Sequence, residues 1–361
     1  MKNKTVTLKD VSLETGYSLI SVHRAVHGKE GVSKKAREEI LKAVKEMGYE
    51  VNYAASSLKR KTLNIAFVSA TSRNKEDYYE HVIRGCKKSI KEFSNLNFNV
   101  SFFLYDINKN AEQNELDVLD EIFNDDVIFD GIVVLPITTS EKMKYAIEKL
   151  IIKGSSVVLL DNDFPTLNRL CYVASKSFVT GQLAGELIDI MNLNTGKIVV
   201  AAGEKDSRVH LENLEGFKEY LNKENNNFEY IDVFNDPTKD TQKEIEKILD
   251  ANDDVVAMYS IRETNTIDLC NAVINKNLVG TIKLIGSDLI PINRQMLKDG
   301  VLTAIVNKEP FERGYYSIKA LVDFLVKKNK TNKDYKTIQT MVVLRSNLKF
   351  YECRYKDDCS N

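Results

Sequence analysis

Side chains that could carry catalysis are scarce in this sequence. The 361 residues include four histidines, and two of these lie within the first 62 residues, so few general bases remain in the rest of the chain. The patterns GxGxxG, GxxxxGKS/T, HExxH and GxSxG do not occur in it. We therefore expect a protein that is not an enzyme and that needs no cofactor.

The acid pairs and the cysteines do not suggest a metal site. The pairs at 125–126 and 253–254 lie in predicted loops, where we expect them to be solvated. The cysteines have neither the CxxC spacing nor the cysteine–histidine spacing of a zinc site, so we expect free, buried thiols and no metal. These cysteines are Cys86, Cys171, Cys270, Cys353 and Cys359.

Basic side chains are concentrated at the start of the chain. Residues 1–62 contain 13 lysines and arginines against 7 acids, whereas residues 63–361 contain 38 against 45. The overall charge of −1 therefore combines a basic head with an acidic remainder. Because binding to phosphate groups requires a basic surface, this asymmetry favours DNA as a partner of the head.

Three short helical patterns follow one another in the head. Gly16 lies where a tight turn between the first two helices needs a left-handed residue. Two helices joined in this way form the helix-turn-helix arrangement, in which the second helix enters the major groove of DNA. The expected helices and N-caps are 8–14 after Thr7, 19–27 after Ser18, and a third helix between Ser33 and Gly48.

The second of these helices has an inner and an outer face. Val22 and Val26 are four residues apart and can pack on the first helix. The side chains left nearer the outer face are those of Leu19, Ile20, His23 and Arg24.

From residue 63 onward, short apolar runs alternate with helical patterns. Alternation at this spacing predicts parallel sheets joined by right-handed crossovers, and two such sheets make a two-lobed α/β domain with its ligand at the carboxyl ends of the strands. The expected strands are 63–69, 98–105, 130–136, 156–161, 170–174, 197–203, 228–234, 255–260, 282–288, 302–306 and 337–345, and the expected helices are 79–93, 111–123, 141–152, 179–191, 211–222, 241–249, 267–275, 292–297 and 313–326.

Nothing in the sequence directs the chain to a membrane. No apolar run approaches the roughly twenty residues of a membrane-spanning helix. The opening stretch MKNKTVTLKD lacks the apolar core of a signal peptide. We therefore expect a cytoplasmic protein.

The head resembles that of the LacI/GalR family of bacterial transcription regulators. The similarity rests on TLKDVSLETGYS, SVHRAVHG, VSKKAREEILKAVKEMGYEVN and AASSLK, which follow one another in register. It implies that Leu19 and Ile20 are the main base-reading pair, that Arg24 makes a further contact, and that Leu58 of a hinge segment is wedged into the minor groove. The DNA-contacting set obtained in this way is Thr7, Ser18, Leu19, Ile20, Ser21, His23, Arg24, Ser33, Asn52 and Leu58.

The head departs from the family at its reading face. An apolar pair can touch thymine methyl groups but offers no hydrogen-bond code, so the operator sequence does not follow from the resemblance. Packing of Leu19 and Ile20 against the third helix is the alternative to base reading. His23 replaces a serine of the family, and an exposed or capping role is its alternative to DNA contact.

The remainder resembles the periplasmic sugar-binding-protein fold of that family, in its ribose-binding form. The markers are VVLLDNDFP, GQLAGELI, LEGFKEYL and KLIGSDLIPINRQMLKDGVLTAIVNKEPFERGYYSIKAL. The resemblance implies that Asp161 and Asp288 accept hydrogen bonds from ligand hydroxyls, with helix capping as the alternative. Asn307 stands where the fold usually has glutamine, and Tyr78 or Tyr79 stands near an aromatic that stacks on a sugar.

Two cleft positions differ from the pattern of the fold. Asn213 replaces an expected arginine, and Arg262 with Glu263 replaces an expected Asn-Asp pair. An arginine at a strand end favours an anionic or polyhydroxylated ligand through its planar donors, and a surface ion pair is the alternative. We expect a carbohydrate-like effector, with a sugar acid, a sugar phosphate or another small polar metabolite also open.

Together these features predict a sequence-specific transcriptional regulator, most simply a repressor. A homodimer would bind a pseudo-palindromic double-stranded operator, and an effector between the lobes would change its affinity. A regulator that needs a co-repressor or a partner protein is the alternative. A sugar-binding transport component is not expected, because it would need a secretion signal and would have no basic head.

The expected divisions are a helix-turn-helix head at 1–50, a hinge at 51–62, a type I periplasmic-binding-protein-like effector-binding and dimerisation domain at 63–345, and a tail at 346–361 that either packs on a lobe or is disordered.

Overall fold

The chain divides into two units, residues 1–61 and residues 62–361. The first unit contains three helices, which are α1 Leu8–Thr15, α2 Leu19–Val26 and α3 Lys34–Glu46. The computed structural model describes residues 6–49, 61–71, 77–107, 110–191, 193, 195–223, 228–236, 238–329 and 336–352.

The predicted caps of the three head helices are confirmed. The hydroxyls of Thr7, Ser18 and Ser33 each accept a hydrogen bond from the backbone N–H three residues later. Gly16 ends α1 with a φ of 71°, as the turn requires. The core of the head consists of Val11, Val22, Ala25 and Ile40.

The second unit has two six-stranded sheets, one in each lobe. The first lobe has the order β11-β5-β4-β3-β1-β2 and is parallel throughout, while the second has the order β12-β10-β9-β8-β6-β7, with β12 antiparallel to β10. The strands are β1 Leu63–Thr71, β2 Phe98–Asp106, β3 Gly131–Val134, β4 Ser156–Leu160, β5 Cys171–Ala174, β6 Lys197–Gly203, β7 Glu229–Phe234, β8 Val255–Ser260, β9 Lys283–Ser287, β10 Ala304–Asn307, β11 Lys336–Thr337 and β12 Met341–Val343.

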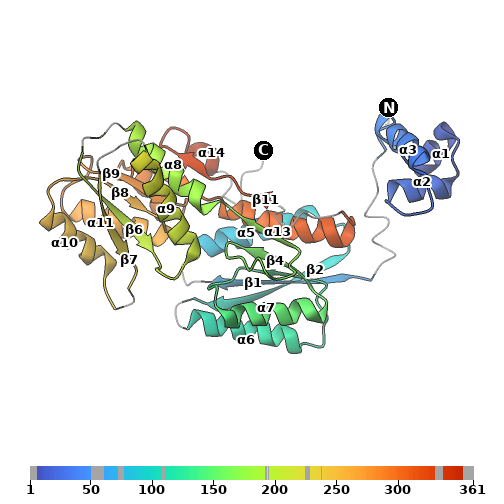
Figure 1. Ribbon diagram of the computed structural model, residues 1–361, viewed down its shortest axis with the longest axis horizontal. Helices are drawn as coiled ribbons and strands as arrows, with labels where there is room; N and C mark the ends of the chain where they lie inside the picture. Colours follow the sequence, from blue (N-terminus) through green and yellow to red (C-terminus); the bar gives the residue numbers. More distant parts are fainter. Residues whose placement is uncertain are drawn as a thin grey trace. The chain divides into compact units, whose positions relative to one another are not determined.

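Helices cover both faces of each sheet (Figure 1). In the first lobe α6 and α7 lie on one face and α5 with α13 on the other; in the second lobe α8 and α9 lie opposite α10 and α11. The helices are α5 Tyr78–Glu92, α6 Ala111–Asn124, α7 Glu141–Lys153, α8 Ser177–Ile190, α9 Arg208–Lys223, α10 Thr241–Ala251, α11 Glu263–Asn275, α12 Pro291–Lys298, α13 Pro310–Leu321 and α14 Lys349–Glu352. None of the helices described is long and apolar enough to span a membrane.

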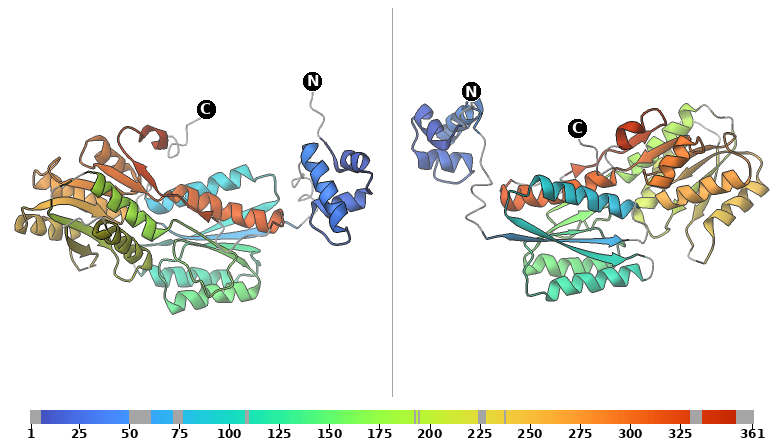
Figure 2. Two further views of the ribbon diagram at one scale, coloured as in Figure 1. Left: turned by 45° about the horizontal axis from the view of Figure 1, so that its top comes forward. Right: turned by 180° about the vertical axis from the view of Figure 1, so that it is seen from behind.

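The chain crosses between the lobes three times. The first crossing joins β5 to α8 and the second joins β10 to α13, which lies against α5 of the first lobe although it follows a strand of the second (Figures 1 and 2). The third joins β11 to β12. The prediction of one strand over 337–345 is therefore wrong, because its ends pair with different sheets.

One other expectation needs correction. The helix predicted at 313–326 begins at Pro310, and its last turn, Val322–Val326, is a π-helix. For the start of the tail the structure agrees with the first alternative, packing on a lobe, because Leu348 and Tyr351 are buried in the core of the second lobe.

Glycines allow α8 and α9 to cross in close contact. A methyl group on Gly181 would overlap the backbone carbonyl oxygen of Asn213, and one on Gly216 would overlap that of Phe178. Both positions therefore exclude a larger residue unless the helices move apart.

Replacing Gly181 by alanine should lower the free energy of unfolding by about 1–3 kcal/mol. Alanine gains roughly 1 kcal/mol in helix propensity, but the overlap is with backbone and no rotamer change relieves it. Urea unfolding measures the difference. The control is Ile190→Ala on the same helix, where the side chain is 68% exposed and little should change. Equal stability of the two variants would contradict this packing argument.

Candidate functional site

A cavity of about 440 Å³ lies between the lobes, at the carboxyl ends of the strands. We call it the inner cavity. Five of the predicted effector residues are in its wall, namely Tyr78, Tyr79, Asp161, Asn213 and Arg262. The other residues of the wall include Ile137, Asn162, Glu204, His210, Glu263, Lys308 and Arg313.

Asp161 follows β4 with a φ of 60° and is held by donors of its own chain. It accepts hydrogen bonds from the Tyr78 hydroxyl and from the Arg313 guanidinium. Arg313 also donates to Tyr78 Oη at 2.7 Å and to Ser175 Oγ at 2.7 Å. Burial opposes the charge of Arg313, but Asp161, Tyr78, Asp288 and Tyr172 together outweigh burial and raise the pKa of this guanidinium. The Asp161 carboxylate is thus not a helix cap, and its contact with a ligand stays a prediction.

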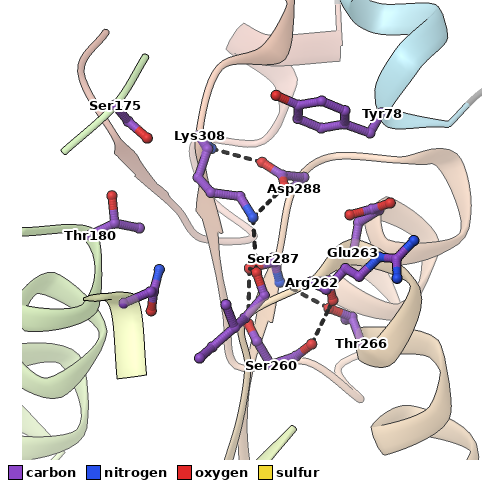
Figure 3. A network of polar contacts seen from close by, with 12 residues as sticks. Tyr78, Ser175, Thr180, Ser260, Arg262, Glu263, Thr266, Ser287, Asp288 and Lys308 are labelled. Atoms are coloured by element: carbon purple, nitrogen blue, oxygen red, sulfur yellow. Dashed lines mark hydrogen bonds and ion pairs between the residues drawn. The ribbon is translucent and has the colours of Figure 1, made fainter. Parts of the chain in front are cut away.

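Asp288 lies beneath Lys308 instead of in the cavity wall. Its carboxylate is 1% exposed and accepts from the Lys308 backbone N–H at 2.8 Å, while the Lys308 ammonium lies 2.9 Å from its other oxygen (Figure 3). The same ammonium donates to the Ile261 carbonyl at 2.9 Å. Asn307 is buried and donates to Glu309 at 3.0 Å. The structure therefore brings Lys308 to the cavity, and neither Asp288 nor Asn307 is part of its wall.

Arg262 forms an ion pair inside the cleft. Its guanidinium binds Glu204, which follows β6. Glu263 is buried beside it, and burial raises the pKa of this carboxyl against the opposing effect of Arg262 and Lys308. Arg262 is therefore ion-paired within the cavity wall and not at the surface, and its contact with a ligand stays a prediction.

Each cation of the cavity wall forms an ion pair with an acid. These cations, Arg262, Lys308 and Arg313, face acids of the same cleft. The acids in the wall are Asp161, Glu204 and Glu263, and Asp288 lies behind Lys308. An anionic ligand would find no unmatched cation among these groups.

His210 is a wall residue that the sequence did not indicate. Its Nδ1 accepts from the backbone N–H of Glu204 at 3.0 Å, and burial lowers its pKa to about 3. The neutral ring must then carry its proton on Nε2, so it offers a donor without a charge. Nearby, Asn213 accepts from the Tyr259 hydroxyl at 2.8 Å.

A buried carboxyl supports one edge of the cavity. Glu115 on α6 is 0% exposed, and it accepts from the backbone N–H of Ile137 at 2.8 Å. Burial raises the pKa of Glu115 to about 8, against the opposing hydrogen bonds of Ile137 and Tyr105. The folded chain therefore holds a proton on Glu115 at pH values where the unfolded chain has lost it.

In the parent protein the free energy of unfolding should fall as pH rises towards 8, and the variant E115Q should remove this decrease. Folding raises the pKa of Glu115 from 4.5 to about 8, so the unfolded chain loses this proton at a lower pH than the folded chain does. The free energy of unfolding therefore falls as pH rises through that interval. Between pH 6.5 and 8, the ionisation of Glu115 should lower the free energy of unfolding by about 2 kcal/mol. The buried histidines His81 and His210, with pKa values near 3, act below this window. Urea unfolding at several pH values should show the slope in the parent and in the exposed control E148Q; a slope retained in E115Q would contradict the assignment.

The head has exposed apolar side chains on the outer face of α2. On α2, Leu19 is 50% exposed and Ile20 is 65% exposed, while Val22 is buried, so packing of the pair on α3 is ruled out. His23 packs on His27 with ring centroids 4.4 Å apart, and Arg24 is exposed. Together with Thr7, Leu8, Lys9, Lys29 and Tyr49, the outer side chains of α2 line a groove of about 800 Å³.

Several members of the predicted DNA-contacting set have capping roles. The hydroxyls of Thr7, Ser18 and Ser33 cap the helices, and that of Ser21 hydrogen-bonds to Ser18. Backbone N–H groups and basic side chains at these helix starts are the groups that contact phosphate in nucleic-acid complexes. Asn52 and Leu58 lie outside the described residues.

Comparison with known proteins identifies both units. Residues 7–52 match the lacI family of bacterial regulatory proteins, and residues 65–329 match the periplasmic binding protein domain. The transcriptional regulator RegA of Clostridium saccharobutylicum is 27% identical over 159 residues, covering 44% of this chain and 45% of RegA, so the match spans less than half of that relative. Catabolite control protein A of Staphylococcus aureus is 24% identical over 244 residues, covering 66% of this chain and 68% of the relative.

The body also has the fold of solved sugar-binding proteins. The glucose-galactose binding protein GanP of Geobacillus stearothermophilus superposes with a TM-score of 0.70 at 22% identity, covering 80% of this chain and 99% of GanP. A helix-turn-helix head followed by such a body defines the class of transcription regulators with a small-molecule effector domain. The chain belongs to the LacI family of bacterial regulatory proteins.

Proposed function

We propose that this protein controls transcription by binding an operator as a homodimer, with a neutral polyhydroxylated effector in the inner cavity setting its affinity. The observation that carries the proposal is the hydrogen-bonding cavity wall, in which every cation is ion-paired, between two lobes of a chain that also has a DNA-binding head. Since the proposed partner is operator DNA, we place the action of the protein in the cytoplasm.

A neutral sugar suits the wall better than a sugar acid or sugar phosphate. Each cation of the wall is already matched by an acid, so an additional negative charge would be desolvated without a new partner. Hydroxyl groups, in contrast, can both donate to the carboxylates and accept from Lys308 and His210. The aromatic rings of Tyr78 and Tyr79 supply an apolar wall for the ring face of a sugar. GanP, which has the same fold, is described as binding glucose and galactose.

For the head, we propose that Leu19, Ile20 and Arg24 read the operator. Two apolar side chains exposed on the outer face of α2 can select thymine methyl groups, and Arg24 can reach a base or a phosphate. The Asn52 and Leu58 contacts and the division into head, hinge, body and tail remain part of this proposal. Effector binding would couple to the heads through closure of the lobes, typically by 1–3 kcal/mol.

A thermal-shift screen tests the effector class. Ligand binding raises the free energy of unfolding by RT ln(1 + [L]/Kd), or about 2.7 kcal/mol at 100 times Kd. We expect neutral sugars to raise the Tm of the full chain, and their sugar acids and sugar phosphates to have a smaller effect. A larger effect of the anionic forms would contradict the charge argument.

Operator binding is tested separately by selecting DNA from a random pool with the full chain. The selected sites should be pseudo-palindromic, and Ile20→Ala should weaken binding to them more than to unrelated DNA. An equal loss on both would remove Ile20 from the reading face.

A further inference from the structure

A second cavity lies next to the inner one, and we call it the outer cavity. Its volume is about 610 Å³, so it is of a size comparable to the inner cavity of about 440 Å³. Both lobes contribute to it, the first through the loop after β4 and the second through the starts of α8 and α9. The two cavities have Asp161, Asn162, Ser177 and Val209 in common. A molecule bound in one therefore lies directly beside the other.

Asn162 is an oriented polar group at the boundary of the two cavities. Its Nδ2 donates to the Pro136 carbonyl at 2.8 Å, which fixes the direction of the amide. The acceptor that this side chain can offer a ligand is consequently its Oδ1. A hydroxyl or a bridging oxygen of a ligand that passes the boundary would lie close to this group.

The outer cavity has an aromatic wall formed by Tyr172 and Phe178. The Tyr172 hydroxyl donates to the Asp161 carbonyl at 2.5 Å, and the Arg169 guanidinium lies 5.6 Å from the ring centroid. Arg169 is held in turn by an ion pair with Asp163. The Tyr172 ring is thus fixed before a ligand arrives, which reduces the entropy lost on binding.

The charged groups of the outer cavity are also matched. Asp163 pairs with Arg169, Asp161 with Arg313, and Glu212 with Arg208. Lys176 and Glu215 add one charge of each sign. The outer cavity therefore has the same character as the inner one, with oriented polar groups, aromatic rings and ion-paired arginines.

We propose that the effector occupies both cavities and is a disaccharide or a longer neutral saccharide. One ring lies in the inner cavity beside Tyr78 and Tyr79, and the next lies in the outer cavity against Tyr172 and Phe178. This inference rests on the proposed function. A single ring in the inner cavity would leave the outer cavity and its oriented aromatic wall unused.

Calorimetric titration of the full chain with single and paired sugar rings tests the inference. The probes are D-glucose and D-galactose on one side, and maltose, cellobiose and lactose on the other. We expect at least one disaccharide to bind about tenfold more tightly than its component rings. Phe178→Ala should remove most of that advantage and leave the affinity for a single ring unchanged. The matched control is Phe350→Ala, an exposed phenylalanine that lines neither cavity.

The outcomes separate this inference from the proposed function. If single rings bind as tightly as disaccharides, or if Phe178→Ala weakens both equally, the outer cavity is not a sugar site, and the proposed effector class still stands. If no saccharide of either length binds, the effector class is wrong and the inference falls with it. Phe178→Leu keeps an apolar side chain but removes the ring, so it should reproduce part of the selective loss even if Phe178→Ala folds poorly.

Discussion

Replacing Arg313 by methionine is expected to lower the free energy of unfolding by about 3–5 kcal/mol. The Arg313 side chain is buried in the first lobe and donates to Asp161, Tyr78 and Ser175. Methionine keeps much of the volume but leaves the Asp161 carboxylate with the Tyr78 hydroxyl and without a cation. An uncompensated buried charge is among the largest costs that a single substitution can cause.

Urea unfolding of R313M gives the size of this effect, and two further variants define its origin. Arg345→Met removes an exposed arginine of the second lobe and should change stability by no more than about 0.5 kcal/mol. Combining Arg313→Met with Asp161→Asn removes both charges, so the double variant should recover part of the stability that R313M loses. Strictly additive losses would show that the two side chains do not form a coupled pair.

The position of Arg313 makes a second consequence measurable. Besides Ser175 in the first crossing, its Nε donates to the carbonyl of Lys308 in the second crossing at 3.2 Å. One side chain therefore connects two of the three segments that join the lobes. R313M should consequently reduce the Tm increase produced by an effector, even when its own lower Tm is taken as the baseline.

Much of the fold could be predicted because its signals are local. The caps of the head depend on single hydroxyl residues, and the alternation of strands and helices depends on apolar spacing within ten to fifteen residues. The run at 337–345 shows the limit of such signals. It is one apolar stretch, but β11 pairs with β5 and β12 pairs with β10, and only the tertiary arrangement separates them.

The candidate site was less predictable because the residues that form its ion pairs are distant from each other in the sequence. Asp161 and Arg313 are 152 residues apart, and no local pattern connects them. Asp288 follows the predicted strand, as the sequence indicated. Its φ is 54°, however, and its carboxylate lies beneath the side chain of Lys308, which belongs to the segment that joins β10 to α13. The available signal was Lys308 itself, a cation directly after β10 in the stretch AIVNKEP.

Asp288→Asn is expected to weaken effector binding by about 2–5 kcal/mol, and to do so through Lys308. Both carboxylate oxygens of Asp288 are engaged by the Lys308 backbone and ammonium, so the acid positions a cation that itself faces the cavity. Lys308→Met should then cause a similar loss of affinity. The double variant should lose little more than either single one, since both substitutions remove the same oriented ammonium.

A double-mutant cycle measured by calorimetry distinguishes this arrangement from direct contact of Asp288 with the effector. If the carboxylate bound the ligand itself, Lys308→Met would release it from its ion pair and affinity would be retained or increased. Under the arrangement found here, the coupling energy between the two positions should approach the loss caused by either substitution alone. Lys88→Met, which removes an exposed cation of α5 in the first lobe, serves as the control for a change of net charge and should leave affinity unaltered. Independent, additive losses for Asp288 and Lys308 would instead make each a separate ligand contact.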